Sequence, residues 1–334
     1  MLLDIIIFFL AFSLVLYCLF GGADFGGGIL ELFVGKHNWQ LVDKAISPVW
    51  EANHVWLVLI VVILFMGFPS IYSIVSQYLH VPILILLVGI ILHGTAFTYR
   101  HYDAKKDASL KVYNWVFRLS SVLATFFLGV IVGAAILGRI TQQPETFYEG
   151  FMAPWINLFS FSVGLFTLFL FSFLAAVYSM GEARGKREKQ ALSRIAKWLT
   201  VATVASGAVV FLIGEMSDLY LLSRFIYSPF AIGSVLISAI ILPFLWRSLT
   251  ENRAWRSRLL AGSEMVLVLV AWFEVQHPVV VAIANAPDLT FQNSAAPEST
   301  LMQLVIALVV GSLIILPLLF YLMRVFKKEQ IPNA

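Results

Sequence analysis

The chain has 334 residues, of which 60% are hydrophobic and 12% are charged, and its mean hydropathy is +0.90. These values exclude a soluble globular protein and predict one embedded in a lipid bilayer. The net charge of +3 does not indicate a nucleic-acid partner, and the single cysteine, Cys18, excludes both an intrachain disulfide and a thiolate-held metal cluster.

Apolar stretches long enough to span a bilayer divide the chain into about nine predicted transmembrane helices. The first stretch lacks the basic n-region and the cleavage site of a signal peptide, so we expect it to be retained. The loops are too short for a separate soluble domain, so residues 1–334 are expected to form a single transmembrane domain. The predicted helices are Leu3–Val34, Val49–Ile71, Leu79–Tyr99, Val116–Gly138, Leu158–Met180, Trp198–Ile213, Phe230–Trp246, Leu259–Ala284 and Leu301–Phe326.

Basic residues fall almost entirely on one side of these predicted helices. Of the 22 Lys and Arg residues, 20 lie on that side, and only Arg139 and Arg224 lie on the other. Cytoplasmic loops carry the excess of Lys and Arg in multi-pass membrane proteins. The distribution therefore predicts an amino terminus outside, a carboxyl terminus in the cytoplasm and an odd number of helices.

Ionisable residues inside a membrane helix are costly unless they are paired or hydrated, so each is a candidate functional residue. Glu31 and Glu264 lie nearer the predicted helix ends, from which a side chain can extend to the interface, and are weaker candidates. The stronger candidates are Asp24, Glu51, His54, His93, Glu274 and His277.

Asp24 lies among the five glycines of Gly21–Gly28, in the predicted cytoplasmic half of the first helix. Glycines let neighbouring helices approach closely in lipid, so this run predicts a tightly packed seam with Asp24 facing protein. A phosphate-binding loop is excluded because the sequence has no preceding strand. Two roles for Asp24 remain open: proton transfer, or a structural hydrogen bond to a neighbouring backbone or basic side chain.

The second predicted helix opens with a crowded polar segment, Ser47–Trp56. Glu51 and His54 are three residues apart and share a helix face, which places a carboxylate and an imidazole within reach of one chain of water molecules. Trp50 belongs either to this site or to the aromatic belt of the membrane interface. With Asp24 on the same predicted side of the membrane, the first two helices are expected to line a hydrated entry from the cytoplasm.

Two further segments form a possible polar pocket, comprising His93, Arg100, Glu274 and His277. His93 is either a haem ligand or a hydrogen-bonded structural histidine. His93 and His277 lie toward opposite ends of their predicted helices, which argues against one haem held by both. Glu274 and His277 share a face beside Pro278, where the sequence predicts either a pocket for a quinone head or ion, or a simple proline kink.

Several segments, in this order and spacing, resemble the cytochrome bd oxidase subunit II family. Gly22–Gly26 resembles the family's Gly-Phe-Asp-x-Gly element, and Pro48–Trp56 resembles its Pro-x-Trp-Asp-x-Asn-x-Val-Trp element. Gly94–Arg100 resembles the end of the family's third helix. Residues 289–301 are similar to the family's Leu-Thr, Asn-Ala-Ala-Ser-Ser and Thr-Leu elements before the last helix.

The resemblance implies a subunit of a complex in the bacterial cytoplasmic membrane that oxidises quinol and reduces dioxygen to water. It implies two four-helix bundles with a peripheral helix, haem b and haem d in the partner subunit I, and proton uptake from the cytoplasm through Asp24, Trp50 and Glu51. His54 is a further candidate for this route. A bound quinone or lipid in this chain, and a small single-helix accessory subunit, are additional expectations.

The sequence also departs from the family pattern. Glu51 stands where the family usually has Asp, Ala23 replaces an aromatic residue, and Glu274 matches no family element. The alternative function is an ion-coupled secondary transporter, because glycine- or proline-interrupted helices that bear carboxylates bind ions in many transporters. The absence of a convincing repeat between the two halves of the sequence argues against that alternative.

Overall fold

The computed structural model describes residues 1–35, 39–102, 109–183 and 185–329, and describes the backbone alone at 40, 48, 49, 51, 101, 102, 109, 320 and 322–329. Within these residues, eight helices are long and apolar enough to cross a membrane. A ninth span is present if Leu41–Ser47 and Ala52–Gly67, inclined at 48°, form one bent helix. The predicted all-helical membrane fold with about nine spans is therefore confirmed.

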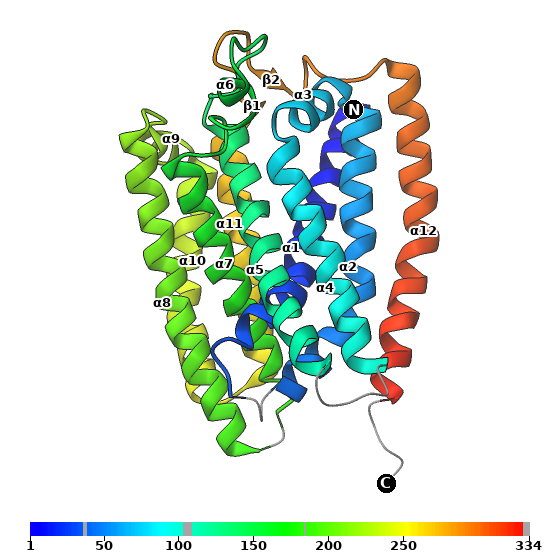
Figure 1. Cartoon of the computed structure of the whole chain (residues 1–334), viewed down its shortest axis with the longest axis vertical. Coiled ribbons are helices and arrows are strands. Elements are labelled where there is room, and N and C mark those ends of the chain that lie inside the picture. The colour runs from blue at the N-terminus through cyan, green and yellow to red at the C-terminus, as the bar shows by residue number, and fades with distance from the viewer. Residues whose placement is uncertain (36–38, 103–108, 184, 330–334) are drawn as a thin grey trace.

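The long helices stand side by side in two groups (Figure 1). The first group consists of α1 (Leu2–Leu30), α2 (Trp39–Gly67), α4 (His80–Tyr102) and α5 (Ser109–Ile136), with the short α3 (Pro69–Tyr78) between α2 and α4. In this group α1 packs against α2 and α5, and α4 packs against α5.

The second group packs against the first through α7 (Leu158–Ser179), which contacts both α1 and α5. The other members of this group are α8 (Lys186–Met216), α10 (Pro229–Thr250) and α11 (Ala254–Gln276), and the short helices are α6 (Phe147–Phe151) and α9 (Leu221–Tyr227). The last helix, α12 (Glu298–Glu329), contacts α1 and α2 and stands at the edge of the molecule in Figure 1.

Glycines bring α1 and α7 into close contact, as the glycine run of the sequence predicts. A methyl group on Gly26 would overlap the backbone carbonyl of Phe171, so no side chain fits where the two helices cross. Phe25, Phe171 and Leu174 lie in the same buried core. The seam thus joins the two helix groups by direct backbone contact, which small residues permit in membrane proteins.

The predicted eighth helix, Leu259–Ala284, ends earlier than expected. Helix α11 stops at Gln276, and β1 (Val279–Val281) then pairs antiparallel with β2 (Leu289–Thr290). The reason is local, because Pro278 has no N–H to continue the helical hydrogen bonds and the β-branched residues after it favour an extended backbone.

The second predicted helix, Val49–Ile71, also has different ends. Helix α2 begins at Trp39 and ends at Gly67, after which Pro69 occupies the first turn of α3. Proline is favoured at that position because the N–H it lacks has no partner in a first helical turn. The short helix α3, of only ten residues, was not predicted because it is too short and too polar to resemble a span.

Candidate functional site

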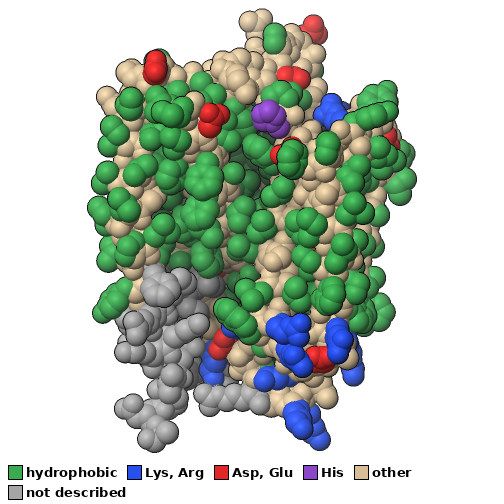
Figure 2. All heavy atoms as spheres, turned by 180° about the vertical axis from the view of Figure 1, so that it is seen from behind, with side chains coloured by type: hydrophobic (Ala, Val, Ile, Leu, Met, Phe, Trp, Pro, Cys, Tyr) green, Lys and Arg blue, Asp and Glu red, His purple; other side chains and the backbone are tan. Residues whose placement is uncertain are grey.

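Lys and Arg side chains gather at one end of the molecule (Figure 2). We call it the basic end; α1 ends there at Leu30, α4 ends there at Tyr102, and α5 begins there at Ser109. The positive-inside rule predicts that this end faces the cytoplasm. The buried ionisable groups of the first helix group lie in the half of the molecule nearer the basic end.

Asp24 of α1 has no exposed surface and faces α2 and α4 instead of lipid. The Nε2 atom of His93 in α4 lies 2.8 Å from its Oδ1 atom, and the Asn53 side chain in α2 donates to Oδ2 over 3.4 Å. His93 and Asn53 are also buried. We call Asp24 and His93 the buried pair, which unites two residues that the sequence placed in separate candidate sites.

The other nitrogen of His93 is also occupied. Its Nδ1 atom lies 2.8 Å from the hydroxyl of Ser121 in α5, and that hydroxyl donates to the Phe117 carbonyl over 2.6 Å. The Phe25 and Phe117 rings pack against the imidazole at centroid distances of 4.7 and 4.6 Å. Because both nitrogens already have hydrogen-bond partners, neither is available to bind a haem iron in this arrangement.

Space for this arrangement depends on Gly28. A methyl group there would overlap the Ser121 hydroxyl and press on the Phe117 ring. Only a residue without Cβ lets α1 pass α5 closely enough for Ser121 to reach His93. The glycine run therefore serves the buried pair as well as the seam with α7.

Four charged side chains, which we call the ion cluster, lie nearer the basic end. Arg100 of α4 contacts Glu31 at 2.8 Å and Asp43 at 3.0 Å, and Arg118 of α5 contacts Glu31 at 3.2 Å. The Glu31 side chain has no exposed surface. Two carboxylates balance two guanidinium groups, which is the condition for burying charges at acceptable cost.

The position of Glu31 near a predicted helix end predicts that its side chain extends to the membrane interface, and this prediction is wrong. Glu31 follows α1 directly, but arginines from two other helices hold its carboxylate inside the protein. One signal was present in the sequence: Glu31 is seven residues after Asp24, which places both on the same face of α1.

Aromatic rings connect the buried pair to the ion cluster. The Phe117 ring stacks on the His93 imidazole and also contacts the Arg100 guanidinium, whose carbon lies 4.5 Å from the ring centroid. Phe97 packs near Phe117 and against Trp50, at centroid distances of 6.0 and 5.3 Å. Trp50 thus lies at the edge of this aromatic layer, beside the predicted proton route.

The structure describes the side chains of two of the three candidates in α2, His54 and Trp50. The Nδ1 atom of half-buried His54 lies 2.9 Å from the backbone carbonyl of Trp50, one helical turn earlier. The indole nitrogen of Trp50 is buried and has no hydrogen-bond partner among the described residues. The side chain of Glu51 lies outside the described residues.

Glu274 and His277 lie at the other end of the molecule, where α11 ends. His277 is exposed and packs near Phe273, and Glu274 forms no hydrogen bond or ion pair within the described part of the chain. His93 and Arg100 belong instead to the buried pair and the ion cluster. The structure therefore divides the predicted polar pocket into residues at two ends of the molecule.

The second helix group has its own buried carboxylate, Glu264 of α11. It accepts a hydrogen bond from the Ser238 hydroxyl of α10, while its other oxygen, Oε1, has no partner among the described residues. Its position near a predicted helix end makes Glu264 a weaker candidate in the sequence, yet the structure buries it.

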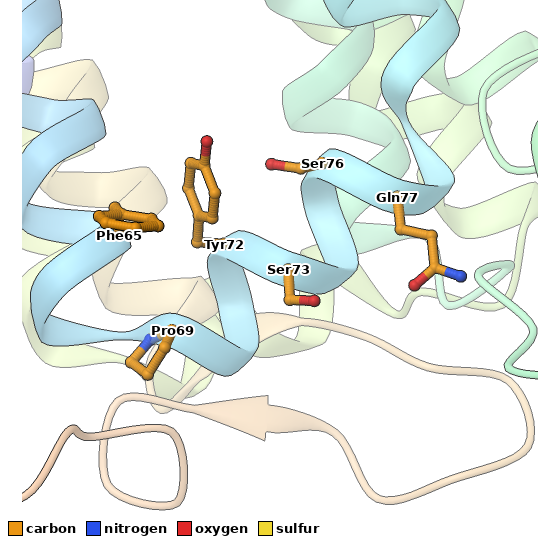
Figure 3. A pocket seen from close by; sticks show the side chains of 6 residues that line it. All are labelled: Phe65, Pro69, Tyr72, Ser73, Ser76 and Gln77. Carbon is orange, nitrogen blue, oxygen red and sulfur yellow. The ribbon is translucent and has the colours of Figure 1, made fainter.

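A surface groove of about 460 Å³ lies along α3 at the end opposite the basic end. Figure 3 shows the Phe65 and Tyr72 rings at one end of the groove and Gln77 at the other, and the rings are 5.1 Å apart. Its lining has no acidic, basic or histidine side chain, so it supplies no group for proton or metal chemistry. Among the described residues, moreover, no three His, Cys, Asp or Glu side chains are placed to hold a metal ion.

The fold and the site define a class of protein: a multi-pass, all-helical membrane protein with ionisable groups buried between its helices. The family model described as cytochrome bd terminal oxidase subunit II matches residues 2–326. The chain belongs to this family. It is therefore a subunit of a quinol-oxidising terminal oxidase of the bacterial cytoplasmic membrane, which leaves no support for the transporter alternative.

Individual relatives agree with this assignment. The chain is 25% identical over 296 residues to cytochrome bd ubiquinol oxidase subunit 2 of Bacillus subtilis, which covers 86% of this chain and 84% of the relative. It is 24% identical to the putative cytochrome bd menaquinol oxidase subunit II of Bacillus subtilis, and that match covers 94% of this chain and 92% of the relative. It is 22% identical to cytochrome bd-I ubiquinol oxidase subunit 2 of Escherichia coli, and that match covers 58% of this chain and 52% of the relative.

The fold also matches a solved structure. A chain in the structure of bd oxidase from Geobacillus thermodenitrificans superposes with a TM-score of 0.77 and 20% identity. The match covers 97% of this chain and 98% of that chain. The fold is thus shared along the whole length, at a level of identity that leaves the functional residues to be argued from their own geometry.

Proposed function

We propose that this chain works in complex with a haem-carrying subunit I and delivers protons to it from the cytoplasm. Reduction of dioxygen to water consumes protons, and groups that carry them through a membrane are ionisable side chains buried between helices. The observation that carries the proposal is the buried pair, in which a carboxylate and an imidazole lie 2.8 Å apart with no exposed surface.

The proposed route begins at the basic end. Glu31 and Asp24 share a face of α1 and are separated by about 10 Å along the helix axis, at a rise of about 1.5 Å per residue. The ion cluster thus lies between the predicted cytoplasmic surface and the buried pair. Proton transfer over that separation requires water or a further side chain between the two groups.

Polar atoms continue the route beyond the buried pair. The Tyr17 hydroxyl, the Asn53 side-chain oxygen and the Thr125 hydroxyl are buried and have no hydrogen-bond partner among the described residues. Thr125 follows Ser121 by one turn of α5, and Tyr17 precedes Asp24 by two turns of α1. Buried polar groups generally bind protein or ordered water, so these atoms mark positions where water would extend the path.

Glu51, Trp50 and His54, on α2, are proposed to belong to the same hydrated route as Asp24. We assign Glu51 the role of a relaying carboxylate, because the matching family position carries an acid associated with proton uptake. Trp50 supplies a packing wall beside it, through its contact with Phe97. His54 lies one turn beyond Trp50, with its Nδ1 atom held by the Trp50 carbonyl.

Haem b, haem d and the quinol-oxidation site are proposed to belong to subunit I. Support comes from His93, whose two nitrogens are engaged by Asp24 and Ser121. A bound quinone or lipid near Glu274 and His277, and a small single-helix accessory subunit, complete the proposed assembly. Membrane lipids are the expected contacts of the exposed apolar side chains on α8, α10 and α12.

The proposal is tested with Asp24→Asn in the complete oxidase. The amide keeps the shape of the carboxylate but does not carry a proton, so we expect oxygen reduction to fall at least about tenfold while haem content stays normal. The matched control is Asp4→Asn, because Asp4 is exposed at the start of α1. A variant with normal haem and normal turnover would show that Asp24 has only a structural role.

A further inference from the structure

We propose that Asp24 and His93 together hold one exchangeable proton, and that Ser121 reverses the direction of its hydrogen bond when this proton is gained or lost. This inference rests on the proposed function and identifies the group that stores the proton. The sequence leaves two roles open for His93, a haem ligand and a structural histidine. Its contacts in the structure make it half of a proton-binding pair.

The first step counts hydrogens along the chain of contacts. A serine hydroxyl has one hydrogen, and the 2.6 Å contact places that of Ser121 on the Phe117 carbonyl. The Ser121 oxygen then accepts, so the Nδ1 atom of His93, at 2.8 Å, must carry a hydrogen. A single further proton lies between Nε2 of His93 and Oδ1 of Asp24.

The proton count fixes the charge of this loaded state. If the shared proton belongs to His93, an imidazolium faces a carboxylate; if it belongs to Asp24, a neutral imidazole faces a carboxylic acid. The sum of charges is zero in both cases. A neutral sum suits a site with no exposed surface, because a net charge there would have to be stabilised without bulk water.

Removing one proton requires a second arrangement of the same atoms. His93 then keeps one hydrogen on Nε2, which it donates to the Asp24 carboxylate, and Nδ1 becomes an acceptor. The Ser121 hydroxyl can satisfy Nδ1 by turning its hydrogen from the Phe117 carbonyl to the imidazole. The two states differ by one proton, by the one negative charge that its loss leaves on the pair, and by the direction of one hydrogen bond; no electron is transferred.

The surroundings of the Phe117 carbonyl lower the free-energy cost of this reversal. It also accepts a hydrogen bond from the Ser120 hydroxyl over 3.0 Å, so it keeps a side-chain partner when Ser121 turns away. Gly28 leaves the space in which the Ser121 hydroxyl contacts α1. The hydroxyl is therefore placed between two acceptors, the Phe117 carbonyl and His93, each of which suits one state.

The charge of the surroundings is balanced, so the proton count of the pair is set locally. Arg100 and Arg118 are matched by Glu31 and Asp43. The ionisable or polar side chains described around the pair are Tyr17 and Glu31 from α1, Asp43 and Asn53 from α2, Arg100 from α4, and Arg118 and Ser121 from α5. Tyr17 and Asn53 carry no charge at neutral pH.

The test follows the pH dependence of the carboxyl and imidazole infrared bands in the purified complete oxidase. We expect a titration step of one proton that moves in Asp24→Asn and also in His93→Gln, because each variant leaves the remaining group to bind a proton without its partner. Two independent steps, each removed by a different one of these variants, would overturn the proposal. So would the absence of any step assignable to either residue over the pH range in which the complex stays assembled.

Two serine variants make the test specific. Ser121→Ala removes a charge-assisted hydrogen bond from the loaded state and a weaker neutral one from the unloaded state, so the step should move down by about one pH unit. The control variant, Ser120→Ala, does not touch His93 but removes the hydrogen bond that the Phe117 carbonyl keeps in the unloaded state, so it should move the step up and not down. Equal shifts in both variants, or none in Ser121→Ala, would contradict the role of Ser121.

Turnover measurements separate this proposal from the proposed function. His93→Gln should slow oxygen reduction, while His80→Gln, at an exposed histidine at the other end of α4, should not. If the shared titration step is present but Asp24→Asn and His93→Gln both turn over normally, proton delivery by this chain is refuted and the proton-binding pair stands. If those variants are slow but the two groups titrate independently, delivery stands and the shared proton is refuted.

Discussion

The two helix groups both bury a carboxylate, but they treat it differently. In the first group Asp24 contacts a histidine and an asparagine, and Glu31 contacts two arginines. In the second group Glu264 has one serine hydroxyl as partner. A carboxylate with a hydroxyl alone is most cheaply buried in its neutral form, whereas carboxylates with basic partners can hold or exchange charge.

The two groups therefore differ in the partners of their buried carboxylates, which are basic side chains in the first group and a hydroxyl in the second. The first group places basic side chains from α4 and α5 against acidic ones from α1 and α2. The second group keeps its described ion pairs, Arg258 with Glu182 and Glu251 with Arg247 and Arg253, partly or largely exposed near the basic end. Proton traffic is therefore expected in the first group, and variants in the two groups should differ in kind.

The largest effect is expected from Glu31→Gln. The change removes the carboxylate that both Arg100 and Arg118 contact, and breaking a buried ion pair in this way costs about 3–5 kcal/mol. We expect little assembled oxidase, measured as haem-containing complex recovered from membranes. The control is Glu182→Gln, whose partner Arg258 is partly exposed, so its loss should cost no more than about 1 kcal/mol. Equal losses would show that burial of the ion cluster is not what makes it important.

A smaller effect is expected at the seam between the groups. Gly26→Ala places a methyl group against the Phe171 carbonyl, a backbone atom that cannot turn aside, and such overpacking costs about 1–3 kcal/mol. The thermal midpoint of the complex in detergent should fall. Gly233→Ala in α10 is the matched control, because a methyl group there meets nothing within 4 Å. If the two variants melt alike, α1 and α7 are not as closely packed as described.

The third prediction concerns the second group itself. Glu264→Gln keeps the shape of the side chain and its contact with Ser238, so we expect a change in stability below about 1 kcal/mol and normal oxygen reduction. Oxygen uptake by the purified complex provides the measurement, with Asp24→Asn as the reference for a slowed enzyme. A loss as large as that of Asp24→Asn would show that both groups carry protons, and the contrast between them would fail.

Most of the fold could be predicted from the sequence because bilayer thickness sets the length of an apolar span. The errors arose where this rule does not act. Helix α11 was extended through Pro278 to Ala284, because apolar residues continue beyond the proline while the backbone becomes extended. The short helix α3 has no span-like signal, so local proline geometry and not hydropathy determines it.

The site was predicted only in part, because partners depend on how helices pack. Asp24 and His93 could each be recognised as ionisable residues in apolar helices, but their 2.8 Å contact joins residues 69 positions apart. Ser121 gave no signal at all, since a serine in a membrane helix usually bonds to its own backbone. Glu31 was misjudged because its position near a helix end does not reveal the arginines contributed by α4 and α5.

The smallest effect is expected outside the membrane, at Glu251 after the end of α10. A hydrogen bond from Arg247 holds the pKa of the Glu251 carboxyl below its usual range, with Arg253 also nearby. A lowered pKa stabilises the folded state above the unfolded-state pKa, and this contribution disappears as the pH falls through the folded-state value. Both side chains are exposed, so solvent and salt screen the interaction and its net contribution should not be measurable. Glu251→Gln should therefore melt like the parent complex from neutral to acidic pH, at low and at high salt. A difference that appears at neutral pH and vanishes in acid would show that an exposed pair contributes to stability, and would weaken the distinction drawn between buried and exposed charges.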